Sequence, residues 1–193
     1  PKAIAAEKRL SAINSTIEIE PVVADVTNSN IEDLVKDCDA VLDGTDNFQI
    51  RYLINDACVS SGTPWVYGAA VSSYGSSMVV LPGYTACVFP EIPNAANLPT
   101  CDTAGVIMPV ILTVSALQTS ELLKILTDNL SDLHNSLIHI DLWSNDWRRI
   151  DAGERDPDCP ACGLLRFDFL DAEAVEFSAV LCGRDAIQIS SGR

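Results

Sequence analysis

Basic residues are scarce in this sequence. Its 193 residues include 12 Lys and Arg against 27 Asp and Glu, which gives a formal net charge of −15. A chain of this charge would repel a phosphate backbone, so we expect no nucleic acid among its partners. The composition is 48% apolar and 20% charged, which indicates a folded chain with a sizeable core rather than a disordered one.

Long apolar runs are also absent. The longest covers residues 105–117 and is followed at once by the polar run 118–121. Because a membrane-spanning helix needs about 20 apolar residues, we expect a buried core helix here and no membrane partner. No secretory segment opens the sequence, and its seven cysteines are odd in number and irregularly spaced. Both features favour reduced thiols and a cytoplasmic location.

Glycine-rich phosphate loops are missing as well. Neither a Gly-x-Gly-x-x-Gly motif nor a Walker-type motif occurs, and the sequence begins at Pro1 rather than at methionine. If a nucleotide binds, its glycine-rich loop must lie upstream of Pro1. We therefore expect the chain to start inside a domain.

What the sequence does contain is an alternation of helical and strand patterns. Helical spacing covers 1–13, 28–36, 48–60 and 105–126, and strand patterns cover 16–26, 40–43, 65–70, 76–81, 137–142 and 147–150. The last two strands are expected to form an antiparallel pair. The alternation predicts an α/β fold, a Rossmann-like sheet whose parallel part is extended by antiparallel strands, with helices on both faces. The proline-containing stretch 82–104 interrupts the pattern and predicts a functional loop.

A polar loop follows the strand expected at 40–43. Asp43 and Asp46 bracket its carboxyl end, where ligands bind in open α/β sheets, and carboxylates there suit Mg²⁺ together with substrate phosphates. The alternative is that Asp46 and Asn47 simply cap the next helix, and the spacing alone favours this alternative. Arg51 lies near the same helix start, within reach of a carboxylate or a phosphate.

Two of the cysteines form a zinc half-site. Cys159-x-x-Cys162 is followed by glycine, and two thiolates on a tight turn can share one tetrahedral ion. Cys87 is the other cysteine that lies among suitable turn residues. The alternative is that Cys159 and Cys162 are ordinary thiols. His134 and His139 are expected to be packed or solvated rather than ligands.

The remaining cysteines differ in their surroundings. Cys101 lies just before the helix expected from residue 105, where a helix N-terminus favours the thiolate, so a nucleophilic role is physically reasonable. Its position alone favours an inert loop thiol. Cys38, Cys58 and Cys182 have apolar neighbours in sequence and are expected to be small core residues.

Six blocks of the sequence stand in a fixed order: Pro1-Lys2-Ala3, residues 40–48, residues 51–58, Gly68-Ala69-Ala70, residues 99–106 and residues 159–163. In order and spacing they resemble the ThiF/MoeB branch of the ubiquitin-activating superfamily. The T-D-N-x-x-x-R and T-C-x-x-A-G blocks are the specific ones. The ending at 181–189 resembles ThiF-type members more loosely.

The resemblance implies a homodimeric adenylyltransferase. Members of that family use ATP and Mg²⁺ to adenylate the C-terminal glycine of a ubiquitin-like sulfur carrier (ThiS- or MoaD-like), for thiamine or molybdenum-cofactor biosynthesis. It implies that Lys2 contacts the ATP phosphates, that Asp46 holds Mg²⁺, and that Asn47 and Arg51 belong to the nucleotide site. Cys101 would be the thiol near the activated carrier.

By the same resemblance, the cysteine pair at 159 and 162 would be half of a four-cysteine Zn²⁺ site, of which Cys87 is the remaining member of the first pair. Residues 1–155 are expected to form an adenylation domain without its phosphate-loop part, and 156–193 to hold the zinc half-site and a tail. The sequence departs from the family in lacking the glycine-rich loop, in the reduced first cysteine pair and in a tail that would continue beyond Arg193.

Two other functions compete with this one. A dehydrogenase-type Rossmann enzyme would need the dinucleotide fingerprint that the sequence lacks. A non-catalytic scaffold with an activating-enzyme fold would bind a ubiquitin-like partner without using ATP. Within the leading function, the tail favours the thiamine pathway.

Overall fold

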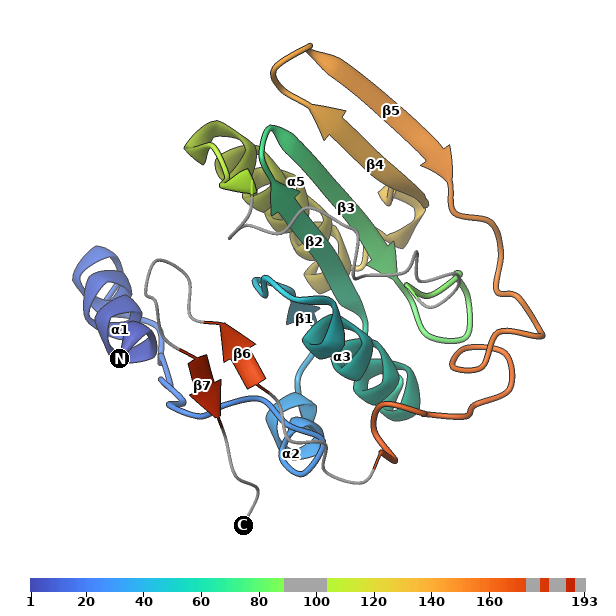
Figure 1. Cartoon of the computed structure of the whole chain (residues 1–193), viewed down its shortest axis with the longest axis horizontal. Helices are drawn as coiled ribbons and strands as arrows, with labels where there is room; N and C mark the ends of the chain where they lie inside the picture. The colour runs from blue at the N-terminus through green and yellow to red at the C-terminus, as the bar shows by residue number, and fades with distance from the viewer. Residues whose placement is uncertain (89–103, 173–177, 181–186, 190–193) are drawn as a thin grey trace.

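The computed structural model describes residues 1–88, 104–172, 178–180 and 187–189. Its centre is a five-stranded mixed sheet with the strand order β1-β2-β3-β4-β5 (Figure 1). The first pair of strands is parallel and the other three pairs are antiparallel. The strands are β1 (Val41–Leu42), β2 (Trp65–Val71), β3 (Tyr74–Val80), β4 (Ser136–Asp141) and β5 (Asp146–Asp151). The expected parallel part extended by antiparallel strands is therefore confirmed.

Helices cover both faces of this sheet, as the alternation predicted. On one face, Trp65 and Tyr67 of β2 pack with the buried residues of α3 (Phe48–Ser61). On the other face, Val66 packs with Ile125 of α5 (Met108–Leu126). In Figure 1, α3 lies in front of the strands and α5 behind them. The continuous apolar sequence of β2 thus follows from burial on both sides.

Helix α3 begins and ends where local chemistry dictates. The side-chain Oδ1 of Asn47 accepts a hydrogen bond from the backbone N of Ile50 at 2.9 Å, which satisfies one of the free amides of the first turn. Gly62 ends the helix with φ of +75°, a conformation that costs other residues a steric penalty. The expected capping role of Asn47 is confirmed.

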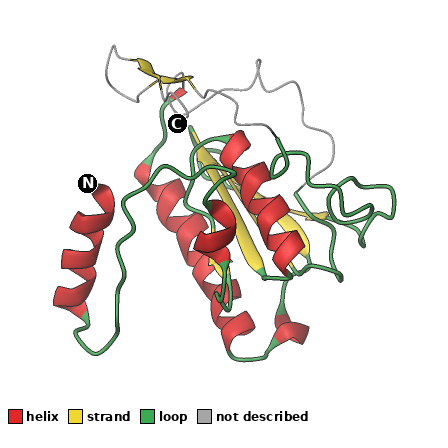
Figure 2. Cartoon of the chain, turned by 90° about the horizontal axis from the view of Figure 1, so that it is seen from below, coloured by secondary structure: helices red, strands yellow, loops and turns green. Residues whose placement is uncertain are grey.

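The N-terminal part differs from the prediction. Helix α1 (Lys2–Ile13) forms as expected but has no buried residue, and Figures 1 and 2 both show it standing apart from the sheet. The strand predicted at 16–26 is wrong: that stretch finds no ladder partner among the described residues and forms no strand. Helix α2 (Ile31–Val35) is shorter than predicted and packs its buried residues against α3.

Helix α5 follows the loop region and lies against the sheet. By length and composition alone, it is the one helix among the described residues that could cross a bilayer; in this fold Val110, Val114 and Ile125 are buried in the core clusters under the sheet. A short 3₁₀ helix, η2 (Leu130–Asp132), connects it to the predicted β4–β5 hairpin. The tail adds an antiparallel pair that the sequence did not suggest, β6 (Ser178–Val180) with β7 (Ile187–Ile189).

Candidate functional site

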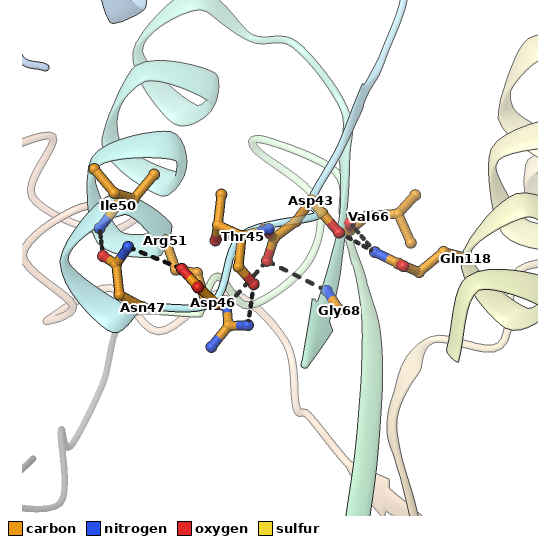
Figure 3. Close-up of polar contacts among 9 residues, drawn as sticks. All are labelled: Asp43, Thr45, Asp46, Asn47, Ile50, Arg51, Val66, Gly68 and Gln118. Atoms are coloured by element: carbon orange, nitrogen blue, oxygen red, sulfur yellow. Dashed lines mark hydrogen bonds and ion pairs between the residues drawn. The ribbon is translucent and has the colours of Figure 1, made fainter. Parts of the chain in front are cut away.

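A buried carboxylate organises the loop that follows β1. Asp43 is only 2% exposed. Its Oδ1 accepts hydrogen bonds from the backbone N of Thr45 at 2.8 Å and from the Thr45 hydroxyl at 2.7 Å. Its Oδ2 accepts from Arg51 Nε at 3.2 Å and from the backbone N of Gly68 at 3.4 Å (Figure 3). The carboxylate thus accepts four hydrogen bonds, and this buried group holds the turn of the loop.

The Arg51 side chain is the cationic partner of that carboxylate. It is 5% exposed, and its Nη2 also donates to the backbone O of Thr45 at 2.6 Å. Its guanidinium lies over the rings of Phe48 and Tyr67, 5.5 and 5.6 Å from their centroids. Of the two partners expected for Arg51, the carboxylate is the one it contacts. Its role in a nucleotide site stays a prediction.

Asp46 and Asn47 lie at the exposed end of the same loop. The Asn47 side chain caps α3 through its oxygen, and its Nδ2 donates to Asp46 Oδ1 at 3.5 Å (Figure 3). The Asp46 carboxylate therefore lies in solvent beside the N-terminus of a 14-residue helix, at the carboxyl end of β1. This is a place where an anionic side chain can hold a cation while the helix end attracts phosphate.

Lys2 is not brought beside that loop. It is the first residue of α1, it is exposed, and α1 stands apart from the end of β1 (Figure 1). The assignment of Lys2 to the ATP phosphates stays a prediction. Cys101, the candidate thiol, lies outside the described residues.

The three cysteines of the expected metal group come together. The Sγ atoms of Cys87, Cys159 and Cys162 all lie within 4.8 Å of one another, and all three residues are buried. The Cys87 and Cys159 sulfurs are 3.6 Å apart. Two thiolates on one tetrahedral Zn²⁺, each about 2.3 Å from it, would lie about 3.8 Å apart. The donor set thus fits three corners of a zinc site, and among the described residues the group has these three members.

Electrostatics distinguish the two cysteines of the C-terminal pair. Burial by itself would raise the pKa of the Cys159 thiol, but hydrogen bonds from the backbone and thiol of Cys162 and from the thiol of Cys87 outweigh it and lower that pKa. Burial raises the pKa of Cys162. Of this pair, Cys159 is therefore the thiol that more readily becomes the anionic ligand a metal requires.

The other thiols and the histidines are structural or exposed. Cys58 is fully buried, as expected, and burial raises its pKa to about 12. The core assignment of Cys38 is wrong, because this residue is exposed beyond the end of α2, and Cys182 lies outside the described residues. His134 packs against Glu121, and His139 bonds the Ser76 hydroxyl at 3.1 Å, so neither belongs to the cysteine group.

Two buried polar residues on α3, whose role the sequence did not indicate, accept hydrogen bonds from backbone amides on either side of the cysteine group. Asn55 Oδ1 accepts from the backbone N of Val88, next to Cys87, at 3.2 Å. Asp56 Oδ2 accepts from the backbone N of Phe169 at 2.9 Å, beyond the Cys159–Cys162 turn. Both residues are 0% exposed. The available signal was a pair of adjacent polar residues among the apolar residues of 52–59 in a core helix.

The fold defines the class of protein. The described chain is similar to solved structures of Escherichia coli MccB, with a TM-score of 0.71 to the ATP complex at 18% sequence identity, covering 84% of this chain and 50% of that one. A second MccB structure, with succinimide, gives a TM-score of 0.70. At this identity the likeness establishes a shared α/β fold.

The sequence comparisons then give the family. The model of the ThiF family matches residues 1–161, and the chain belongs to the ThiF family. Relatives include the "Sulfur carrier protein ThiS adenylyltransferase" of Bacillus subtilis, 42% identical over 99% of this chain, and the "SAMP-activating enzyme E1" of Haloferax volcanii, 34% identical over 93% of it. The chain spans 57% and 67% of the length of these two relatives.

Proposed function

We propose that the protein carrying this chain uses ATP to adenylate the C-terminal glycine of a ubiquitin-like sulfur-carrier protein, for thiamine (thiazole) or molybdenum-cofactor biosynthesis. One observation carries the proposal: an exposed Asp46 beside a capped helix N-terminus, on a loop held rigid by a buried Asp43–Arg51 pair. The named relatives, sulfur-carrier adenylyltransferases among them, support the choice of reaction.

The reaction requires positioning and charge stabilisation more than covalent chemistry from the protein. A carboxylate oxygen of the carrier's terminal glycine forms a bond to the α-phosphorus, the bond between that phosphorus and the bridging oxygen to the β-phosphorus breaks, and pyrophosphate leaves. Negative charge spreads over the phosphoryl oxygens in the transition state. Asp46 would hold Mg²⁺, which neutralises that charge when bound. Asn47 would line the nucleotide, and Lys2 and Arg51 would supply positive charge to the phosphates.

The remaining parts of the proposal concern the rest of the assembly. Residues 1–155 would belong to the adenylation domain, completed by a glycine-rich phosphate loop upstream of Pro1, and 156–193 would hold the zinc pair and tail. Cys87, Cys159 and Cys162 would bind a structural Zn²⁺, and Cys101 would lie near the activated carrier. The enzyme would act as a homodimer, which the family resemblance implies, and in the cytoplasm, where its seven cysteines would stay reduced.

The test is carrier-dependent ATP–pyrophosphate exchange with the full-length protein, run with a ThiS-like and with a MoaD-like carrier. We expect exchange with one of them, which also assigns the pathway. Asp46→Asn should lower the exchange rate about 100-fold or more at limiting Mg²⁺, since it removes a charge that acts in the transition state. Asp33→Asn, which removes another exposed carboxylate, from α2, is the matched control and should leave the rate unchanged.

The non-catalytic alternative predicts a different result. A scaffold would bind a ubiquitin-like carrier in a pull-down or calorimetric titration and give no exchange with either carrier. Binding without exchange, in a preparation that binds ATP, would refute the adenylation proposal and support the scaffold.

A further inference from the structure

Strand β1 separates from β2 just before the loop that bears Asp46. The two strands run parallel with Leu42 paired to Val66, and the backbone N of Asp43 still donates to Val66 O at 3.0 Å. In a regular parallel ladder, the next bond would run from Gly68 N to Asp43 O. Here Gly68 N donates instead to the Asp43 side chain, at 3.4 Å. The backbone carbonyl of Asp43 therefore loses its ladder donor at the point where the loop begins.

A side chain of α5, which covers the face of the sheet opposite α3, replaces that bond. Gln118 of α5 is 4% exposed, and its Nε2 donates to Asp43 O at 2.8 Å and to Val66 O at 3.1 Å (Figure 3). This amide group thus satisfies the Asp43 carbonyl, and it is a second donor to the Val66 carbonyl, which already accepts from Asp43 N. Leaving the Asp43 carbonyl without a donor would be unfavourable in a dry interior.

The neighbouring glycine makes room for this amide. A Cβ atom added to Gly68 would lie 2.6 Å from Gln118 Oε1, closer than real Cβ atoms approach any heavy atom. Gly68 does not have a positive φ, so backbone strain does not explain the glycine. The close approach of the Gln118 side chain to β2 does.

We propose that Gln118 is a positioning residue that sets the Asp46 carboxylate for its metal-binding role; this inference rests on the proposed function. Its amide holds the Asp43 carbonyl, and the Asp43 carboxylate in turn holds both donors of Thr45. Asp46 is the next residue along the chain. The position of Asp46 is thus set from α5 through a chain of hydrogen bonds that is buried at Gln118 and partly buried at Thr45.

Gln118 differs in its contacts from residues of α5 that only stabilise the packing of this helix. Val114 lies one turn earlier on the same helix and is 4% exposed, like Gln118. It packs in the apolar cluster with Val110, Ile138 and Ile140, under the antiparallel strands and away from the loop after β1. Both residues contribute to stability, but only Gln118 bonds to the backbone that leads to Asp46.

The experiment compares Gln118→Met with Val114→Ala in the full-length protein. Methionine keeps the length of the side chain and removes both hydrogen-bond donors. We expect Gln118→Met to raise the Mg²⁺ concentration for half-maximal ATP–pyrophosphate exchange about tenfold, with a rate within about twofold of the parent at saturating Mg²⁺. Val114→Ala should lower Tm by about as much as Gln118→Met does, roughly 4–8 °C, but it should leave the Mg²⁺ dependence unchanged.

A second readout does not depend on activity. Hydrogen exchange of the Thr45 and Gly68 amides should be at least about tenfold faster in Gln118→Met than in the parent protein. In Val114→Ala it should be no faster than the lower free energy of unfolding accounts for. If Gln118→Met fails to fold, Gly68→Ala displaces the same amide from the other side and should raise the Mg²⁺ requirement in the same way.

The outcomes distinguish failure of the proposed adenylation function from failure of the positioning role of Gln118. An inactive parent enzyme refutes the proposed function, while amide exchange still tests whether Gln118 holds the loop. The positioning role is overturned if the parent is active and the two variants, Gln118→Met and Val114→Ala, show the same Mg²⁺ dependence and the same pattern of amide hydrogen exchange.

Discussion

Replacing the buried carboxylate of Asp56 by an amide should change how the stability of this protein depends on pH. Asp56 is 0% exposed, and its Oδ2 accepts from the backbone N of Phe169 and of Leu170. Burial raises the pKa of Asp56 from 3.8 to about 6, against the opposing effect of these hydrogen bonds. In Asp56→Asn, the amide oxygen can accept the same bonds without carrying a charge.

The sign of the effect follows from where the proton binds more tightly. Below about pH 3 the carboxyl is protonated in both the folded and the unfolded chain, and its ionisation costs nothing. Between about pH 3 and pH 7 the unfolded chain loses the proton more readily, so the free energy of unfolding falls as pH rises. Above about pH 7 the loss is complete. A pKa raised from 3.8 to about 6 corresponds to a loss of about 3 kcal/mol.

The assay is urea unfolding at 25 °C between pH 4 and pH 8, followed by the fluorescence of the buried Trp65. The quantity of interest is the free energy of unfolding of the parent minus that of Asp56→Asn, in which other titrating groups cancel. It should fall by about 2–3 kcal/mol between pH 4 and pH 7, the part of the total loss that lies in this window. Glu18→Gln removes one exposed charge from the same acidic chain and should give a flat difference.

Two results would refute this reasoning. Parallel pH curves for the parent and Asp56→Asn would mean that the pKa of Asp56 is the same in the folded and unfolded states. A difference that rises with pH would mean that the Phe169 and Leu170 amides stabilise the carboxylate more than burial destabilises it.

Three further predictions concern the other buried groups. Arg51→Met should lower the free energy of unfolding by about 3–5 kcal/mol, because it leaves the Asp43 carboxylate buried without its cation, and adding Asp43→Asn should recover part of that loss in denaturant titrations. Cys159→Ser should lower the zinc content per chain measured by elemental analysis and remove the effect of a chelator on Tm; a parent protein that contains no zinc would contradict the metal assignment. Gly68→Ala should lower stability by about 1–3 kcal/mol, and a cycle with Gln118→Ala should be non-additive because the second change opens space for the new methyl group; an additive cycle would contradict the steric explanation.

The fold was predictable where local pattern and burial agree. The continuous apolar run of β2 indicates a strand covered on both faces, and Asn47 with Gly62 marks both ends of α3. The stretch 16–26 has an equally good strand pattern but forms no strand, since a strand needs a partner to complete its hydrogen bonds and pattern alone does not supply one. Cys38 fails for a related reason: apolar neighbours in sequence need not surround a residue in space.

The candidate site was predictable only in part. The loop after β1 carries its signal in a few consecutive residues, and the three cysteines carry theirs in spacing, so both groups could be found. Gln118 lies 75 residues from Asp43 along the chain, and no local motif connects them. Only the fold brings α5 across β2 to that carbonyl, so the contact could be inferred from packing and not from spacing.

The cysteine cluster has a consequence for the way the chain is tied together. Cys87 and Cys159 are 72 residues apart, and the stretch between them contains α5 and the β4–β5 hairpin. A metal bound by all three thiols would act as a cross-link that closes this stretch into a ring. Closing a ring of this size removes about 4 kcal/mol of chain entropy from the unfolded state, by analogy with a disulfide. While the ion stays bound, α5 and the β4–β5 hairpin would unfold only as a closed ring, so that metal supply would control the stability of that part of the molecule.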